Sequence, residues 1–147
     1  MSTRRLAGKV FVITGGASGI GAACARRYAA EGGSVVVADL SARGAEIAAE
    51  LGDLGGAGHF VATDVSDPHA LEHLLDETVR VFGHVDVWHN NAFSSVFKPI
   101  AEQTLEEFDQ TIQVSLRAYW YGSKLAVTHM LGHGGGLILH TASVQSY

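Results

Sequence analysis

The chain has 147 residues, 47% of them hydrophobic and 17% charged, which fits one globular domain with a buried core and excludes a disordered or fibrous protein. Its formal net charge of −5 provides no basic surface, so we expect neither nucleic acid nor an anionic membrane as a partner. No apolar stretch is long enough to span a membrane, and the single cysteine, Cys24, excludes an internal disulfide, so both observations favour a cytoplasmic protein.

Strand-like and helix-like segments then alternate along the whole chain. Short, continuous apolar runs such as KVFVIT and SVVVADL are typical of strands buried on both faces. The predicted strands are 9–14, 34–40, 58–65, 85–90 and 135–143, and the predicted helices are 19–31, 41–51, 67–82 and a long helix beginning at 104. This alternation predicts an α/β fold, in which helices cover both faces of a parallel sheet.

Capping signals mark several helix ends. Gly32 follows the first helix, and Asp67 with Pro68 is a capping carboxylate followed by proline at the first helical position. Thr104 and Glu107 have the spacing of a capping box. In the long helix that they open, we expect one stripe to face inward, formed by Phe108, Ile112, Leu116, Tyr119, Ser123 and Val127.

The turn after the first strand is rich in glycine. In VFVITGGASGIG, Gly15, Gly19 and Gly21 lie between the strand and the first helix with the spacing G-x-x-x-G-x-G. Glycine permits a tight turn and lets the backbone approach a pyrophosphate, whose charge meets the free N–H groups of the helix start. Ser18 can add a hydroxyl donor. The turn therefore indicates a dinucleotide site, although such a run by itself can also be merely a tight turn.

Asp39 closes the second strand about 20 residues after these glycines, where a carboxylate can accept hydrogen bonds from the ribose diol of an adenine nucleotide. The same charge repels a 2′-phosphate, and neither Ser18 nor Leu40 supplies a compensating cation. Arg43 lies one turn into the next helix, where we expect it in solvent. The pattern favours NAD over NADP as the cofactor. The alternative for Asp39 is that it is simply a strand-end or cap residue.

Polar residues also follow the third and fourth predicted strands. Asp64 can accept a hydrogen bond from an adenine amino group, while Val65 donates its backbone N–H. Asn91 can anchor the ribose or brace the loop. Each of these is an ordinary turn residue on its own, but the carboxyl ends of parallel strands meet at one edge of a sheet, where ligands bind.

Taken in order, these motifs resemble the short-chain dehydrogenase/reductase family. The residues that carry the resemblance are the TGGASGIG run at 14–21, Asp39, Asp64–Val65, Asn90–Asn91–Ala92 and Ser143. The resemblance covers essentially the whole chain and implies a doubly wound (Rossmann) parallel sheet with strand order 3-2-1-4-5. It further implies NAD(P)-dependent hydride transfer between a small alcohol and a ketone, in a homo-oligomer that is a dimer or tetramer. The implied cofactor contacts are Gly15, Ser18, Gly19, Ile20, Gly21, Asp39, Leu40, Asp64, Val65 and Asn91.

The catalytic part of the family pattern is incomplete. The family's acid/base is a tyrosine placed four residues before a lysine that lowers its pKa, and its serine, matched by Ser143, orients and polarises the substrate oxygen. Tyr147 has no lysine after it, so we expect it to begin a substrate loop. We therefore expect residues 1–147 to be the N-terminal, incomplete Rossmann domain of a longer oxidoreductase and to be inactive alone. None of the three lysines has a tyrosine at the family's spacing, because the residues four places before Lys9, Lys98 and Lys124 are Arg5, Ser94 and Trp120.

Two further positions depart from the family. Ser115 stands where the family has an asparagine that supports a relay water, and a serine can also hold a water. The family's NNAG is NNAF here, so Phe93 places a bulky ring near the nicotinamide end, where it either shapes a substrate pocket or simply packs.

Other signals support weaker alternatives. The run HALEH at 69–73 matches a zinc-peptidase pattern without an evident third ligand, so we expect no metal. His89 and His140 end strands near the predicted site, where they can touch substrate or pack with hydrogen bonds, and we favour packing. Ser143 lacks the nucleophile elbow of a hydrolase. The alternative to an enzyme is a non-catalytic nucleotide-binding or interaction module on the same scaffold.

Overall fold

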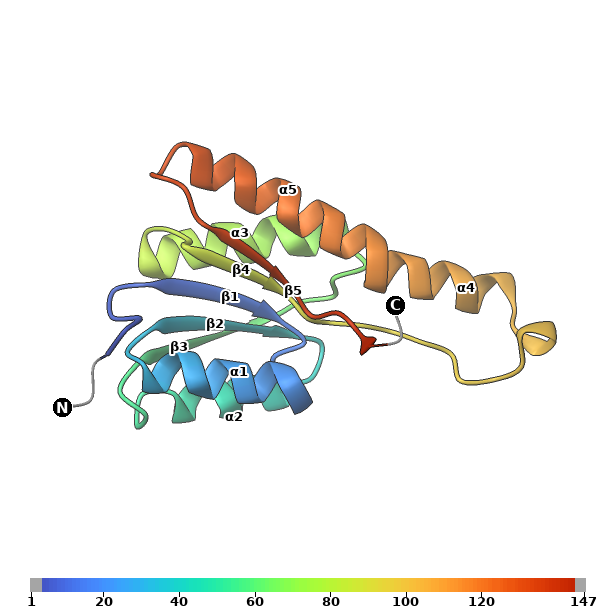
Figure 1. Cartoon of the computed structure of the whole chain (residues 1–147), viewed down its shortest axis with the longest axis horizontal. Coiled ribbons are helices and arrows are strands. Elements are labelled where there is room, and N and C mark those ends of the chain that lie inside the picture. The colour runs from blue at the N-terminus through green and yellow to red at the C-terminus, as the bar shows by residue number, and fades with distance from the viewer. Residues whose placement is uncertain (1–3, 145–147) are drawn as a thin grey trace.

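The computed structural model describes residues 4–144. Five parallel strands form one sheet in the order β3-β2-β1-β4-β5, as predicted (Figure 1). The strands are β1 (Val10–Thr14), β2 (Ser34–Asp39), β3 (Ala57–Ala62), β4 (Val87–Asn90) and β5 (Leu137–His140). The helices are α1 (Gly19–Ala30), α2 (Arg43–Glu50), α3 (Pro68–Phe82), the short η1 (Ile100–Glu102), α4 (Leu105–Ile112), the π-helical turn η2 (Gln113–Arg117) and α5 (Ala118–Leu131).

The helices lie on both faces of the sheet, with α1 and α2 on one side and α3 and α5 on the other (Figure 1). Successive residues of β1 therefore enter different cores. Phe11 and Ile13 pack with α1 and α2, whereas Val12 packs with α3 and α5. Because both faces are covered, the central strands are continuous apolar runs rather than alternating ones. In the described part of the chain, no helix combines the length and apolar character needed to cross a membrane.

Local capping positions the helices as the sequence predicts. The Asp67 carboxylate accepts a hydrogen bond from the backbone N–H of His69 at 2.9 Å, and α3 ends at Gly83, whose φ is +85°. Thr104 and Glu107 form both halves of a capping box at the start of α4. Each cap satisfies backbone groups that the helix itself cannot pair.

The inward stripe that we expected for the long helix is wrong for Phe108, Ile112, Leu116 and Val127, which are exposed, whereas Tyr119 and Ser123 are half-buried. Phe108 is 55% exposed and Leu116 is 61% exposed, so the large apolar stripe faces outward. The buried stripe is mostly small, because the helix lies close to the sheet: a Cβ on Gly122 would lie 2.8 Å from Trp88 Nε1. The buried residues of η2 and α5 are Val114, Ala118, Gly122, Ala126 and Met130.

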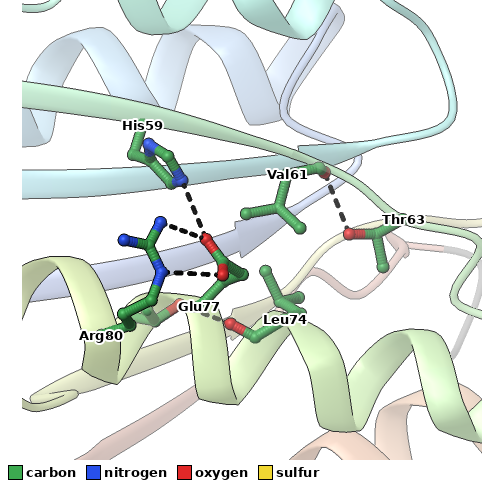
Figure 2. A network of polar contacts seen from close by, with 7 residues as sticks. His59, Val61, Thr63, Leu74, Glu77 and Arg80 are labelled. Carbon is green, nitrogen blue, oxygen red and sulfur yellow. Dashed lines mark hydrogen bonds and ion pairs between the residues drawn. The ribbon is translucent and has the colours of Figure 1, made fainter.

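Edge strand β3 is tied to helix α3 by polar side chains. Figure 2 shows Glu77 of α3 between Arg80 and His59, with its carboxylate 2.7 Å from Arg80 Nη2 and 3.6 Å from His59 Nε2. At the carboxyl end of β3, the Thr63 hydroxyl donates to the carbonyl of Val61 at 3.0 Å. Thr63 and the two residues after it lie at the carboxyl edge of the sheet.

Candidate functional site

A cavity of about 440 Å³ opens at the carboxyl edge of the sheet, where β1 to β4 end. Its walls include every residue predicted to contact a cofactor except Gly21, namely Gly15, Ser18, Gly19, Ile20, Asp39, Leu40, Asp64, Val65 and Asn91. The remaining wall residues are Thr63, Ala92, Phe93, Ser94, Gln110, Val114 and Thr141. The fold thus brings the predicted set to one place.

The glycine turn forms the floor of this cavity. Gly15 and Gly19 have φ values of +66° and +51°, in the left-handed region that favours glycine. Gly21 lies beneath them, where an added Cβ would be 2.1 Å from the carbonyl oxygen of Gly15 and 2.7 Å from Asn91 Nδ2. Gly21 therefore shapes the turn from below, which explains why it is absent from the cavity wall.

The start of α1 offers free backbone donors to the cavity. Ser18 is the N-cap residue, but its side chain makes no capping hydrogen bond. The first turn of a helix carries N–H groups without partners inside the helix, and these groups attract anions. Ser18, Gly19 and Ile20 are all exposed, so their polar groups can reach a ligand.

Asp39 joins the end of β2 to the glycine turn. One carboxylate oxygen accepts a hydrogen bond from the backbone N–H of Ala17 at 2.9 Å, and the other accepts one from the N–H of Ser41 at 2.9 Å. The carboxylate therefore lies beside the bend it was predicted to serve. Among the described residues that line the cavity, Asp39 and Asp64 are acidic and none is Lys or Arg.

Asp64 and Val65 form the turn after β3. Oδ1 of Asp64 accepts from the backbone N–H and the hydroxyl of Ser66, at 2.9 and 2.7 Å. Arg117 of η2 donates to the carbonyl of Ser66 at 2.6 Å and so ties this turn to the long helix. Val65 is buried, whereas Asp64 is exposed at the cavity.

Asn91 braces the floor of the cavity. Its Nδ2 donates to the carbonyl of Thr14 at 3.0 Å and to that of Gly15 at 3.1 Å. Its backbone N–H donates to the Thr14 hydroxyl at 3.0 Å. Its Oδ1 accepts from the hydroxyl of Thr141 at 2.9 Å. Of the two roles expected for Asn91, the hydrogen bonds show the brace.

One wall of the cavity comes from the segment after β4. Phe93 lines the cavity and is 73% exposed as a residue, so it belongs to neither core of the described chain. Next to it, Ser94 is held by Ser115, whose hydroxyl donates to the Ser94 carbonyl at 2.8 Å and accepts from its N–H at 3.0 Å. Ser115 therefore fixes the loop that carries Phe93.

Ser115 and Ser143, the two predicted catalytic residues, do not line this cavity. Ser115 instead faces a second hollow of about 400 Å³ together with Tyr119 and His140. Ser143 is exposed beyond the end of β5. Tyr147, predicted to begin a substrate loop, lies outside the described residues.

Of the two strand-end histidines, His89 is packed in the interior as favoured, and His140 is exposed but stacks on a neighbouring ring. His89 is 6% exposed and contacts the Tyr28 hydroxyl and the Thr141 hydroxyl, each at 3.0 Å. Burial lowers the pKa of His89, with a smaller effect from His140, whereas burial raises the pKa of Tyr28 to about 12. His140 is exposed and stacks on Tyr119 with 5.5 Å between ring centroids.

Among the residues that sequence reasoning missed are the cavity-wall residues Thr63 and Thr141, and the bracing role of Thr14, which was named only as the first residue of the glycine-rich run. Thr14 ends β1, and its buried hydroxyl accepts from the N–H groups of Asn91 and Ala92. Each of these threonines is the last residue of a strand or follows one closely, which is a signal that could have indicated them.

Comparisons with known proteins agree with this geometry. Residues 9–147 match the family model for short chain dehydrogenases. An uncharacterized oxidoreductase of Thermotoga maritima is 38% identical over 143 residues, covering 97% of this chain and 56% of that protein. D-threitol dehydrogenase of Mycolicibacterium smegmatis is 39% identical over 140 residues, covering 95% of this chain and 54% of that protein.

Solved structures share the same architecture. The crystal structure of NAD+-bound xylitol dehydrogenase superposes with a TM-score of 0.91 at 26% identity, covering 97% of this chain and 55% of that one. The chain spans about half the length of the curated relatives it matches.

Proposed function

This chain belongs to the short chain dehydrogenase family, and on that premise we propose that it carries the NAD site of an oxidoreductase that interconverts an alcohol and a carbonyl. The observation that carries the proposal is the cavity in which the Asp39 carboxylate is hydrogen-bonded to the glycine turn. The relatives named above are dehydrogenases and oxidoreductases, which favours an enzyme over a non-catalytic module.

The residues present fit a dinucleotide. Gly21 leaves no room for a side chain and so allows close packing beneath the turn, whereas Gly19, which faces open space, lets the backbone approach the pyrophosphate. The exposed amides after Ser18 would hold the phosphates, and Asp39 would accept from the adenosine ribose. Asp64 and Val65 would hold the adenine. When bound, the nicotinamide supplies the hydride acceptor or donor.

NAD is the form of the cofactor that we propose. A 2′-phosphate would meet the Asp39 carboxylate, and no described wall residue offers a cation to offset that repulsion. Arg43, the cation expected in solvent, is exposed and does not line the cavity. NADP would therefore bind less tightly.

For the chemical step, we propose that Ser143 orients and polarises the substrate oxygen. Ser115 acts on the site through Ser94, since its hydroxyl accepts from the N–H of that residue and donates to its carbonyl. No tyrosine in the chain precedes a lysine by four residues, so the acid/base of the proposed reaction would come from outside residues 1–147. The relatives, of which the chain covers about half, support a longer complete enzyme.

We infer that the complete enzyme is a homo-oligomer, a dimer or tetramer, in the cytoplasm. Large apolar side chains on one side of the α4–α5 helix are exposed in the described chain, and an exposed apolar surface of this kind is typical of an interface. These are Phe108, Leu116, Trp120 and Leu131.

The test is NAD reduction by the complete protein with a panel of small secondary alcohols, followed at 340 nm. We expect turnover with at least one alcohol and a loss of about 100-fold or more in kcat for Ser143→Ala, as for removal of an oxyanion-stabilising donor. Ser95→Ala, an exposed serine outside the cavity, is the matched control and should retain activity. If Ser143→Ala turns over at the wild-type rate, Ser143 has no catalytic role.

A further inference from the structure

The orientation of the Asn91 amide is determined by its neighbours. Its Nδ2 lies 3.0 Å from the carbonyl of Thr14 and 3.1 Å from that of Gly15, and two carbonyl oxygens require a donor between them. The amide oxygen must then face the Thr141 hydroxyl, 2.9 Å away. Because an amide oxygen only accepts, the single hydrogen of that hydroxyl is donated to Asn91.

This direction fixes the proton on His89. The Thr141 oxygen has given its hydrogen to Asn91, so it can only accept from the His89 Nε2 that lies 3.0 Å away. His89 must therefore carry a hydrogen on Nε2. Burial disfavours the charged ring, so Nδ1 is left as an acceptor for the Tyr28 hydroxyl at 3.0 Å.

The result is a chain of hydrogen bonds that all point the same way. It runs from Tyr28 on α1 through His89 on β4 and Thr141 after β5 to Asn91 after β4, and from there to the carbonyl of Gly15 in the cavity floor. Figure 1 shows β4 between β1 and β5, so the chain of bonds crosses three neighbouring strands. His89 is 6% exposed and Asn91 is 7% exposed, so water does not readily replace these partners.

We propose that His89 is a positioning residue for the nucleotide site, which holds the Thr141 hydroxyl on Asn91 and thereby holds the glycine turn in its binding shape. His89 itself does not line the cavity; it acts through Thr141, which does. The inference rests on the proposed function for the identity of the ligand, but not for the existence of the hydrogen-bonded chain.

The experiment is a double-mutant cycle on the complete protein, with NADH binding measured by fluorescence titration. His89→Leu keeps bulk and removes the donor, and Thr141→Val keeps shape and removes the hydroxyl. Loss of one buried hydrogen bond is expected to weaken NADH binding about fivefold in each single variant. Because His89 acts through Thr141, the double variant should also be about fivefold weaker, rather than about 25-fold.

Two control variants test whether the loss of NADH affinity comes from the hydrogen-bond donor of His89. His89→Gln can still donate an N–H toward Thr141 and should bind NADH within about twofold of wild type. Ser123→Ala removes a hydroxyl that bonds the adjacent Asn90 but is not part of this chain of bonds, so it should also stay within about twofold. If His89→Leu does not fold, the test uses Thr141→Val and His89→Gln, with the NADH affinities expected above for each.

Three results would overturn the proposal. The first is a double variant whose loss of NADH affinity is the product of the two single losses, and the second is a single variant with wild-type NADH affinity. The third is a His89→Gln variant that binds NADH as weakly as His89→Leu. Absence of NADH binding by the wild-type protein would instead refute the proposed function. In that case the urea unfolding midpoints of the same variants are compared. A double variant whose midpoint shifts by no more than that of one single variant supports the chain of hydrogen bonds, and a shift equal to the sum of the two single shifts refutes it.

Discussion

Replacement of Gly21 by alanine tests how the cavity floor is built. The added Cβ would lie 2.1 Å from the carbonyl oxygen of Gly15 and 2.8 Å from its carbonyl carbon, far inside normal contact. Neither backbone atom can move without displacing the whole turn. Overpacking in well-packed sites costs about 1–3 kcal/mol, and a clash with two backbone atoms should fall at the upper end or above it.

The matched controls are two other glycines of the same chain. Gly19 has open space around its Cβ position but a φ of +51°, so Gly19→Ala should cost about 1–2 kcal/mol through backbone strain alone. Gly52 has its nearest atom at 4.0 Å and no positive φ, so Gly52→Ala should change stability by about 0.5 kcal/mol or less.

The assay is urea unfolding of the complete protein by circular dichroism, together with NADH titration of each folded variant. We expect the free energy of unfolding to fall in the order Gly52→Ala, Gly19→Ala, Gly21→Ala, with NADH binding weakened at Gly21 and Gly19 but not at Gly52. A Gly21→Ala variant as stable as Gly52→Ala, with undiminished NADH affinity, would show that the space beneath the turn does not require glycine.

Three further predictions address other parts of the molecule. The Arg80 guanidinium lowers the pKa of the Glu77 carboxyl to about 2 from its usual 4.5, so its contribution to stability is fully present above pH 4.5 and lost as the pH falls toward 2; Glu77→Gln should flatten the change of urea midpoint across that window. Gly122→Ala places a Cβ 2.8 Å from Trp88 Nε1 and should lower the free energy of unfolding by about 1–3 kcal/mol in urea titrations. Leu116→Ser changes an apolar side chain that is 61% exposed, and it should shift the complete protein toward monomers in light scattering, with little effect on NADH binding.

Matched control variants separate these specific effects from a general loss of stability. Glu46→Gln alters an exposed carboxylate on α2 with no ion pair of its own among the described residues, and it should leave the pH dependence unchanged. Gly132→Ala, whose nearest atom lies at 3.7 Å, should be nearly neutral beside Gly122→Ala. A monodisperse wild-type monomer would contradict the inferred interface before any variant is made.

Features coded by neighbouring residues could be predicted from the sequence. The cap at Asp67 depends on the following proline and a backbone N–H two residues on, and the capping box of Thr104 depends on Glu107 one turn later. The strand order followed from the resemblance, and the wall of the cavity followed from the rule that parallel strands end at one edge.

Features that depend on distant contacts could not be predicted in the same way. The buried side of α5 was missed because hydrophobicity favours the large residues, whereas close approach to the sheet selects small ones such as Gly122. The hydroxyl of Thr141 bonds Asn91 from 50 positions away, and Ser115 bonds Ser94 from 21 positions away. No local pattern specifies which of these partners meet.

The role of Asp39 in the nucleotide site is tested by titration of the complete protein with NADH and with NADPH, in wild type and in Asp39→Asn. We predict saturable NADH binding in wild type that is about tenfold or more tighter than NADPH binding, from the charged hydrogen bonds of Asp39 and its repulsion of a 2′-phosphate. The neutral variant should lose most of that preference. Equal affinity for the two nucleotides in wild type, or a preference unchanged in Asp39→Asn, would show that Asp39 does not select NAD.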